Sequence, residues 1–378
     1  MIEIYGPCPD RFSGVRDAFA ANFTAAPEGL DELAARFSVC IGGETVIDLW
    51  AGHADTARTA PFTDTTLTPV FSTGKAVMAL MIARLVDQGL IAYDTPVAEV
   101  WPAFGQAGKD RVTLGQLMSH QAGLPGFSET ADPAIWFDRE AVLDRLCAQP
   151  PMWPPGTASG YHPITIGYLA GELFRRLDGR TMGTALREDF ARPFGLDLWL
   201  GLPDAEHGRV AQLRKPSAPP DLGTIDAVKK AAFLDRGSAP GGRGSAEWRS
   251  MEIPSANMHA RADALARVMG VLANGGRLDG ETVLSEAALA EATRERIHGP
   301  DRVLPFTIPW AAGWMRNEGL DIFGPNPGAL GHCGWGGSCA MADPITNVSA
   351  AYVMTRQSPH LIGDPRALRL FEALYAAL

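Results

Sequence analysis

The chain reads Val70-Phe71-Ser72-Thr73-Gly74-Lys75-Ala76-Val77-Met78-Ala79-Leu80 at the start of an apolar run that ends near Gly89. As a helix, this run places Ser72 and Lys75 one turn apart on the same face, so their side chains can meet. A lysine partly removed from water has a lowered pKa and can take the hydroxyl proton of a serine, which turns a weak nucleophile into a reactive one. The same two residues also fit a helix N-cap followed by a solvated lysine, so the pair alone leaves both interpretations open.

Composition limits the classes of protein to which the chain can belong. Its 378 residues are 46% hydrophobic and 20% charged, which is ordinary for a folded globular protein. A net charge of −10 disfavours nucleic acid and anionic membrane as partners. No stretch reaches the roughly 18 apolar residues of a membrane span, and the first residues lack the pattern of a signal peptide. We therefore expect a cytoplasmic protein whose oligomeric state the sequence leaves open.

Cysteines and histidines give no pattern typical of a metal site. The five cysteines have no metal-ligand or Cys-x-x-Cys spacing and are expected to be free thiols. Sensitivity of Cys333 or Cys339 to thiol reagents is an alternative, and buried inert packing is the expected role of both. Histidines that lie near other motifs are expected to be mostly structural. These are His120, His162, His259 and His332. No metal and no other cofactor is expected.

Strand patterns lie near both ends of the chain and helical patterns lie between them. Residues 36–50 predict a β-hairpin that turns at Gly42-Gly43. Further strands are predicted over 311–315, 337–342 and 348–355. Periodicity predicts helices over 13–23, with Ser13 as a possible N-cap, and over 72–89, 112–120, 134–147, 164–177, 182–190, 262–273, 285–293 and 366–378.

This order predicts an α+β fold in which one antiparallel sheet is built from both chain ends. Residues 1–72 and 300–378 would form an α/β lobe, with helices from both termini against the sheet. Residues 73–299 would form a mainly helical lobe with an irregular loop, 204–252, that shapes the substrate entrance. A catalytic cleft would lie between the lobes, and the whole would act as one catalytic unit.

Two later segments supply further residues that could act together with the serine and the lysine in catalysis. Residues 155–162 place Tyr161 and His162 between a turn and a helix, and Gly331 to Ser338 is a glycine-rich strand entry. In this order the motifs resemble the serine β-lactamase and penicillin-recognising superfamily, on its class C side, and most strongly the family VIII carboxylesterases. The resemblance runs from about Phe37 to about Arg356 and implies the β-lactamase-like two-lobe fold.

Each of the three sequence motifs of the superfamily has a counterpart in this chain. Ser72-Thr73-Gly74-Lys75 matches the Ser-x-x-Lys motif, and Tyr161 matches the tyrosine of Tyr-x-Asn. His332-Cys333-Gly334 matches the third motif, which is Lys-Thr-Gly in lactamases and His-x-Gly in many esterase-like members. Trp335-Gly336-Gly337 is the alternative for that position, because some family esterases carry Trp-x-Gly. Spacing to the Asp343-Pro344 turn favours His332.

The resemblance implies a mechanism through an acyl-enzyme. Ser72 would attack an ester carbonyl while Lys75 and Tyr161 handle its proton, either of them as the base, and Tyr161 would protonate the leaving alcohol. The backbone N–H groups of Ser72 and Trp335 would bind the oxyanion. Residues expected to contact substrate are His332, Cys333, Gly334, Gly336, Gly337, His162 and Trp153.

Departures from the family pattern decide between substrates. Pro163 stands where lactamases have the asparagine of Tyr-x-Asn, and His332 stands where they have the lysine that meets the drug's carboxylate. These two departures favour carboxylic esters with small or short acyl groups over β-lactams as substrates. A β-lactamase or D-amino-acid peptidase or amidase, an acyltransferase and a catalytically silent binding protein remain alternatives. No Gly-x-Ser-x-Gly pentapeptide supports an α/β-hydrolase, and Pro69 and Ala76 break a P-loop pattern.

Overall fold

The computed structural model describes residues 2–378 and contains one antiparallel nine-stranded sheet, in the order β1-β3-β2-β14-β13-β12-β11-β10-β9. The first three strands come from the N-terminal end: β1 (Ile4–Tyr5), β2 (Ala34–Ile41) and β3 (Glu44–Gly52). The other six come from the C-terminal end: β9 (Ile297–Pro300), β10 (Thr307–Trp310), β11 (Met315–Arg316), β12 (Leu330–Cys333), β13 (Cys339–Asp343) and β14 (Val348–Met354). Strand β14 pairs with β2 along its whole length, so the prediction of one sheet built from both ends is confirmed.

The hairpin of β2 and β3 forms where the sequence predicts it. Its turn contains Gly42 with a φ of 59° and Gly43 with a φ of 90°. Residues with side chains rarely adopt these left-handed conformations, whereas glycine adopts them without a steric penalty. The two glycines therefore set the position of the turn.

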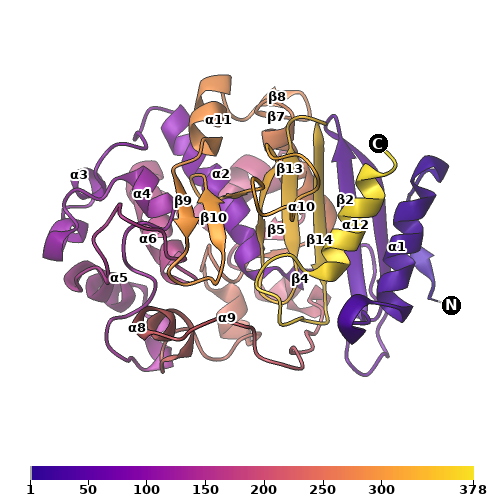
Figure 1. Cartoon of the computed structure of the whole chain (residues 1–378), viewed down its shortest axis with the longest axis horizontal. Coiled ribbons are helices and arrows are strands. Elements are labelled where there is room, and N and C mark those ends of the chain that lie inside the picture. The colour runs from indigo at the N-terminus through magenta and orange to yellow at the C-terminus, as the bar shows by residue number, and fades with distance from the viewer. Residues whose placement is uncertain (1) are drawn as a thin grey trace.

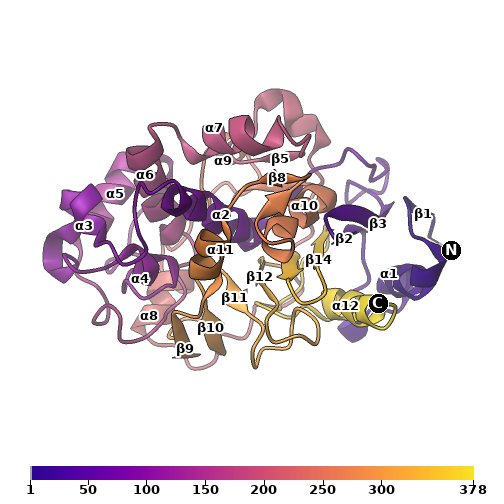
Figure 2. The ribbon, with the colours of Figure 1, turned by 90° about the horizontal axis from the view of Figure 1, so that it is seen from above.

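Helices cover both faces of the sheet (Figures 1 and 2). Helices α1 (Ser13–Thr24) and α12 (Pro365–Tyr375) lie side by side on one face, and α10 (Ala262–Ala273) packs on the other. Because successive strand residues point to opposite faces, β14 divides its side chains between two cores. Tyr352 packs with α1 and α12, whereas Val353 packs with the helices of the opposite face.

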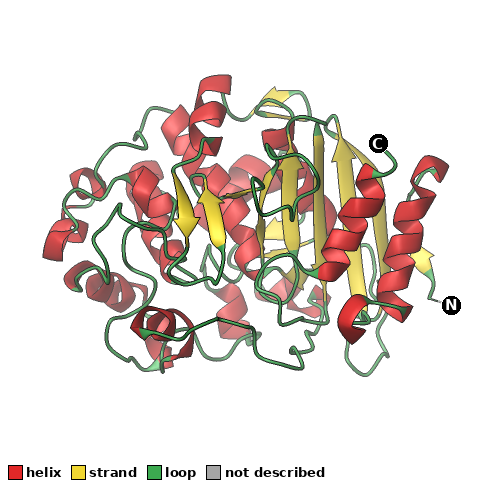
Figure 3. Cartoon of the chain, viewed as in Figure 1, coloured by secondary structure: helices red, strands yellow, loops and turns green. Residues whose placement is uncertain are grey.

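Helix α2 (Gly74–Asp87) is almost fully buried. Most of the remaining helices lie beyond the edge of the large sheet (Figure 3). The remaining helices are α3 (Val97–Val100), α4 (Leu114–Met118), α5 (Arg139–Ala148), α6 (Thr165–Asp178), α7 (Met182–Leu186), α8 (Ala227–Lys229), α9 (Ala246–Ser250) and α11 (Glu286–Thr293). Short 3-10 segments cover Asp10–Phe12, Pro27–Gly29, Phe71–Thr73, Pro102–Gly108, Pro133–Phe137 and Asp204–Arg209, and π-helical turns cover Arg187–Ala191 and Lys230–Leu234. Helix α2 packs against α6, α10, α11 and β12, so it joins the helical part to the sheet.

Two small sheets complete the chain. One has the order β4-β6-β5, formed by β4 (Thr68–Pro69), β6 (His259–Ala260) and β5 (Leu198–Trp199). It lies directly before the segment that carries Ser72. The other is a short hairpin of β7 (Arg277–Leu278) and β8 (Glu281–Thr282).

Some predicted elements are wrong in position or role. Ser13 is the first residue of α1 and not its N-cap, because a 3-10 turn runs directly into the helix and makes Phe12 the capping residue. Of the predicted strand 311–315, only Met315 lies in a strand, β11, while residues 311–314 form a tight turn between β10 and β11. In this turn the N–H of Ala311 donates to the carbonyl of Trp314 at 2.9 Å. Strands β9 and β10 were not predicted, and the predicted strand entry Gly331 to Ser338 covers only part of β12. Helix α10 packs on a face of the sheet, and β9 is the edge strand of the sheet, next to β10.

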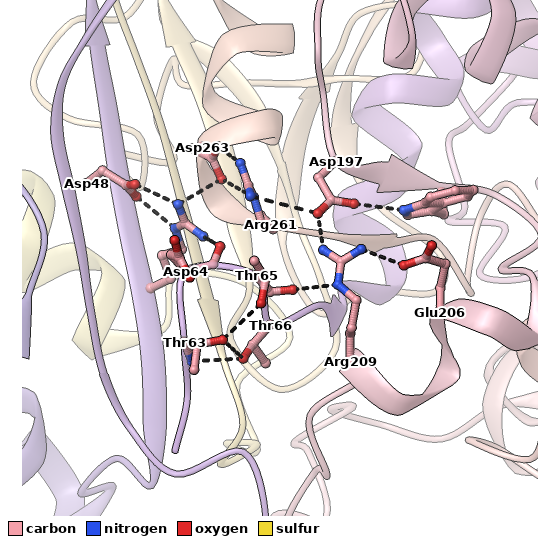
Figure 4. A network of polar contacts seen from close by, with 12 residues as sticks. Asp48, Thr63, Asp64, Thr65, Thr66, Asp197, Glu206, Arg209, Arg261 and Asp263 are labelled. Atoms are coloured by element: carbon pink, nitrogen blue, oxygen red, sulfur yellow. Dashed lines mark hydrogen bonds and ion pairs between the residues drawn. The ribbon is translucent and has the colours of Figure 1, made fainter. Parts of the chain in front are cut away.

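A chain of alternating charges ties the sheet to the loop that leads to Ser72 (Figure 4). It runs through Asp48, Arg36, Asp263, Arg261, Asp197, Arg209 and Glu206. Arg36 donates to the carbonyl of Asp64 at 2.6 Å, and Arg209 donates to the carbonyl of Thr65 at 2.9 Å. The loop 63–66 is therefore held from two sides immediately before β4.

Among residues 2–378, no helix combines the length and the apolar character that crossing a bilayer requires.

Candidate active site

Ser72 lies in the 3-10 turn that opens into α2. The residue before it, Phe71, has a φ of 48°, a left-handed conformation that is rare and costly for a bulky side chain. Phe71 and Thr73 on either side are buried, whereas Ser72 is partly exposed and lines a cavity. The strained turn therefore presents the Ser72 hydroxyl to the cavity.

Lys75 is fully buried one turn further along, and its Nζ lies 2.8 Å from Ser72 Oγ. The same Nζ donates to the backbone carbonyls of Pro163 and Ser255, each at 2.8 Å. No carboxylate pairs with it among residues 2–378, and burial lowers the pKa of Lys75 well below its ordinary value of 10.5. A neutral amine has two hydrogens for the two carbonyls and one lone pair for the Ser72 hydroxyl. The surroundings of Lys75 fit those of a base.

Tyr161 lines the same cavity and its ring lies beside Lys75, with Nζ 4.8 Å from the ring centroid. The ring stacks on Trp310 at 6.0 Å with an interplanar angle of 7°, and His120 meets its edge at 5.0 Å. Burial raises the pKa of Tyr161 above its ordinary value of 10, although a hydrogen bond with the Ser72 side chain opposes the shift. At neutral pH the phenol is therefore protonated and suited to act as an acid.

Asp301 holds this tyrosine in place and was missed by sequence reasoning. Its carboxylate accepts the backbone N–H groups of Tyr161 and Val303 at 2.9 Å and of Leu304 at 3.0 Å. It also accepts Trp310 Nε1–H at 3.2 Å, so one carboxylate fixes both stacked rings. Asp301 directly follows β9, which the sequence did not predict, and no motif marks it.

The loop between β12 and β13 meets the nucleophile turn. Ser338 Oγ donates to the carbonyl of Val70 at 2.9 Å and lies 2.9 Å from Thr73 Oγ1. The approach is so close that a Cβ on Gly334 would lie 2.4 Å from the Val70 carbonyl oxygen. Among residues 2–378, the backbone N–H groups of Ser72 and Trp335 have no acceptor, and both residues line the cavity. Two donors are therefore free for an oxyanion.

The structure places His332, which the sequence predicts to contact substrate, outside the lining of this cavity. His332 is fully buried behind Tyr161, at 5.9 Å between ring centroids, while the next residue, Cys333, lines the cavity. Alternation along β12 explains this, because only every second side chain faces the cavity. His332 Nδ1 contacts the carbonyl of Cys333 at 2.8 Å, and burial lowers the pKa of His332 to about 3, so the ring is neutral. In the third motif, Cys333 and Trp335 reach the cavity and His332 does not.

Other residues expected in the pocket also lie outside its lining. His162 is fully buried, and its Nε2 accepts the Leu124 N–H at 3.0 Å. Trp153 is buried, and its Nε1–H donates to the carbonyl of Ala158 at 3.0 Å. The positive φ values of Gly336 and Gly337, 90° and 117°, shape the loop that presents Trp335. Cys339 lies behind Cys333, with the two sulfurs 3.9 Å apart as free thiols.

The cavity in front of Ser72 has a volume of about 590 Å³ and is mostly apolar. Part of its wall comes from the irregular segment 204–252, as expected from the sequence. Its larger apolar side chains are Phe71, Ile164, Leu222, Ile225, Phe233, Leu234, Leu304, Met315, Trp335 and Leu361. A cavity of this size and polarity suits an uncharged organic group beside the serine.

Comparison with known proteins agrees with the fold. The Beta-lactamase family model matches residues 19–375. The chain is 37% identical to the esterase/beta-lactamase LipL of Mycobacterium tuberculosis, in a match that covers 96% of this chain and 85% of that protein. Among solved structures, a penicillin-binding protein homolog from Caulobacter crescentus has a TM-score of 0.97 at 58% identity, and a family VIII carboxylesterase has 0.92 at 39%. Both matches cover 100% of each chain.

Proposed function

Because the chain belongs to the beta-lactamase family, we propose that it is a serine hydrolase that cleaves carboxylic esters through an acyl-enzyme on Ser72. The observation that carries this proposal is the 2.8 Å contact between Ser72 Oγ and Nζ of a fully buried Lys75. An amine without a carboxylate partner loses its proton on burial and becomes a base for the neighbouring hydroxyl.

Lys75 is the base of the first step. It takes the Ser72 proton as Oγ forms a bond to the ester carbonyl carbon, and the carbonyl oxygen becomes an oxyanion. The N–H groups of Ser72 and Trp335 stabilise that oxyanion, and each such donor contributes roughly 3 kcal/mol in comparable sites.

Tyr161 is the acid of the second step. It donates its proton to the alkoxide as the carbon–oxygen bond to the alcohol breaks, and it recovers a proton from the Lys75 ammonium. This assignment rests on the raised pKa of the Tyr161 phenol, which keeps its proton at neutral pH. Water then attacks the acyl-enzyme by the reverse proton transfers and releases the acid.

The site draws on both parts of the chain, so we treat them as one catalytic unit. Ser72 comes from the 3-10 turn before α2 and Lys75 from the start of α2. Tyr161 comes from the segment before α6, and Trp335 from the loop between β12 and β13.

Esters are favoured over amides by several observations. The match to LipL, named esterase/beta-lactamase, and the likeness to a solved family VIII carboxylesterase both support ester cleavage. Pro163 offers no side-chain amide near the serine, and its carbonyl is already bound to Lys75. The mainly apolar cavity suits a small or short acyl group.

A substrate panel with a matched pair of variants tests this function. The panel contains p-nitrophenyl acetate and butyrate, a chromogenic cephalosporin and a D-amino-acid amide, each with and without an added alcohol. We expect rapid ester turnover, negligible cephalosporin turnover and a mass increase of one acyl group on Ser72. Ser72→Ala should lose turnover with an unchanged circular dichroism spectrum, while Ser128→Ala, at an exposed serine, should behave like the wild type.

Each other outcome identifies a different enzyme or overturns the proposal. Full activity of Ser72→Ala would end it. Faster turnover of the cephalosporin than of the esters would indicate a lactamase. Transfer of the acyl group to the alcohol in preference to water would indicate an acyltransferase.

A further inference from the structure

A second cavity of about 770 Å³ adjoins the one in front of Ser72. The two share the wall residues Phe71, Pro219, Arg243 and Trp335. Its lining contains the cations Lys215, Arg243 and Arg249, and among residues 2–378 no aspartate or glutamate lines it, in a chain whose net charge is −10. We call this second cavity the cationic chamber.

We propose that the cationic chamber binds an oxyanion group, a carboxylate or a phosphate, carried by the ester substrate at a distance from its scissile carbonyl. The inference rests on the proposed esterase function and names the class of ester that the site takes. An apolar part of the substrate would occupy the cavity before Ser72, and the anionic end would lie beyond Arg243.

Arg243 stands in the wall that the two cavities share. Its guanidinium lies 5.6 Å from the ring centroid of Phe71, the residue directly before the nucleophile. No ion pair or hydrogen bond of its side chain is found among residues 2–378. Its charge is therefore free for a ligand that extends from Ser72 into the chamber.

Arg249 and His259 lie in the lining with buried polar atoms that have no partner among residues 2–378. His259 is fully buried, and neither ring nitrogen has a hydrogen-bond partner among residues 2–378. Arg249 donates through Nη1 to the carbonyl of His207 at 3.3 Å, while its buried Nε–H has no acceptor. Buried polar groups are nearly always hydrogen-bonded, so these free groups indicate a ligand that supplies acceptors.

Neighbouring carboxylates do not neutralise the chamber, because other arginines bind them (Figure 4). Asp197 and Glu206 pair with Arg209, and Asp263 pairs with Arg261. Arg209 directly precedes Val210, where the chamber wall begins, so the same ion pairs also hold that wall against the sheet. The arrangement leaves the chamber with positive charge and no internal counter-charge.

The positive charge therefore comes from the segment 215–249 and not from the third motif. His332 stands where lactamases carry a cationic lysine, but it is neutral and enclosed. A chain that is acidic overall repels anions from most of its surface, so a local group of cations provides selective attraction.

A pair of esters that differ by one charge tests the proposal. The charged ester is mono-4-nitrophenyl suberate, and its neutral control is the methyl ester of the same compound. We expect the wild type to favour the charged ester in kcat/KM by about tenfold or more, a ratio typical of one charge-assisted hydrogen bond. The preference should shrink as salt is added.

Substitutions of single arginines test which residues cause the preference for the charged ester. Arg243→Gln and Arg249→Gln should each reduce the charged-to-neutral ratio by about tenfold. The matched control is Arg236→Gln, since Arg236 lies on the same segment but pairs at the exposed surface with Asp132. Equal kcat/KM for the two esters in the wild type, or an equal loss of the ratio in Arg236→Gln, would overturn the proposal.

Binding without turnover separates this proposal from the proposed function. Glutarate and inorganic phosphate should each raise the melting temperature of Ser72→Ala, and should do so less in Ser72→Ala combined with Arg249→Gln. The stronger of the two ligands identifies the group as carboxylate or phosphate. If Ser72 hydrolyses esters but the protein shows neither a charge preference nor anion binding, only the proposal of an anion site in the cationic chamber is refuted. If anions bind but no ester is hydrolysed, only the proposed esterase function is refuted.

Discussion

The carboxylate of Asp301 accepts the backbone N–H of Tyr161 at 2.9 Å, although 140 residues separate them in the chain. The same carboxylate accepts the indole N–H of Trp310, on which the Tyr161 ring stacks. Asp301 therefore joins β10 to the segment that carries the proposed acid, and it positions that acid without touching substrate.

We expect Asp301→Asn to reduce kcat more than it changes KM. The amide oxygen can still accept backbone N–H groups, but the amide nitrogen would face Trp310 Nε1–H as a second donor. Loss of that buried hydrogen bond should cost about 1–3 kcal/mol of unfolding free energy. Urea unfolding measures the loss of unfolding free energy, and p-nitrophenyl butyrate kinetics measure kcat and KM. Asp321→Asn, at an exposed carboxylate, is the control, and identical results for both variants would contradict the role of Asp301.

The pH dependence of the reaction should report the buried amine of Lys75. Turnover needs Lys75 without its proton, so kcat/KM should fall as pH drops through a pKa well below 10.5. It should not decline as pH rises to about 10, because the pKa of Tyr161 is raised above that value. The measurement is a pH–rate profile from which the rate with Ser72→Ala is subtracted. A rise of activity centred near 10.5 would mean that Lys75 is an ordinary solvated lysine.

The same shift of the Lys75 pKa has a consequence for stability. Below 10.5 the unfolded chain binds a proton at Lys75, while the folded chain does not until its lower pKa is reached. In that window Lys75 opposes folding, and the opposition disappears as pH rises toward 10.5.

Gly334→Ala should displace the loop that carries Trp335. A Cβ at this position would lie 2.3 Å from Ser338 Oγ and 2.7 Å from Thr73 Oγ1, so the contact between the loop and the nucleophile turn cannot persist. We expect ester turnover to fall by about a hundredfold, as when one oxyanion donor is lost. The control is Gly299→Ala on β9, where a Cβ would meet nothing within 4 Å. Retained activity in Gly334→Ala would show that the loop position is not needed.

Glu32 should make stability depend on pH near neutrality. It is fully buried and pairs with Arg366 at 2.5 Å, yet burial outweighs that attraction and raises the pKa of Glu32 to about 7. Between about 4.5 and about 7, the folded chain keeps a proton that the unfolded chain has lost, so this contribution to stability disappears as pH rises. Over this pH range the free energy of unfolding should fall by about 3 kcal/mol.

Urea unfolding at several pH values measures this contribution. Glu32→Gln cannot ionise and should flatten the pH dependence relative to the wild type. Glu318→Gln, at an exposed carboxylate, should follow the wild type. If the free energy of unfolding changes with pH in the same way in Glu32→Gln and in the wild type, a group other than Glu32 causes the pH dependence.

Much of the fold and the centre of the site could be predicted because their signals are local. The spacing of Ser72 and Lys75 follows from the helix period, and the β2–β3 turn follows from two glycines. The prediction that both chain ends share a sheet is confirmed, since strand patterns lie at both ends. The predicted strand entry Gly331 to Ser338 covers only part of β12, because Leu330–Cys333 is short and contains glycine and histidine, residues with little strand preference.

The sequence by itself determined which residues are present with the right chemistry: a serine and a lysine one helical turn apart, a tyrosine, and a glycine-rich loop. Only the tertiary structure decided their surroundings. It buried Lys75 without a carboxylate partner among residues 2–378, turned His332 behind Tyr161 and Cys333 toward the cavity, and brought Asp301 into contact with the Tyr161 backbone. It also gathered Arg243 and Arg249 in one cavity lining without a counter-charge among residues 2–378. Burial and strand facing depend on how distant segments pack, and no local pattern encodes them.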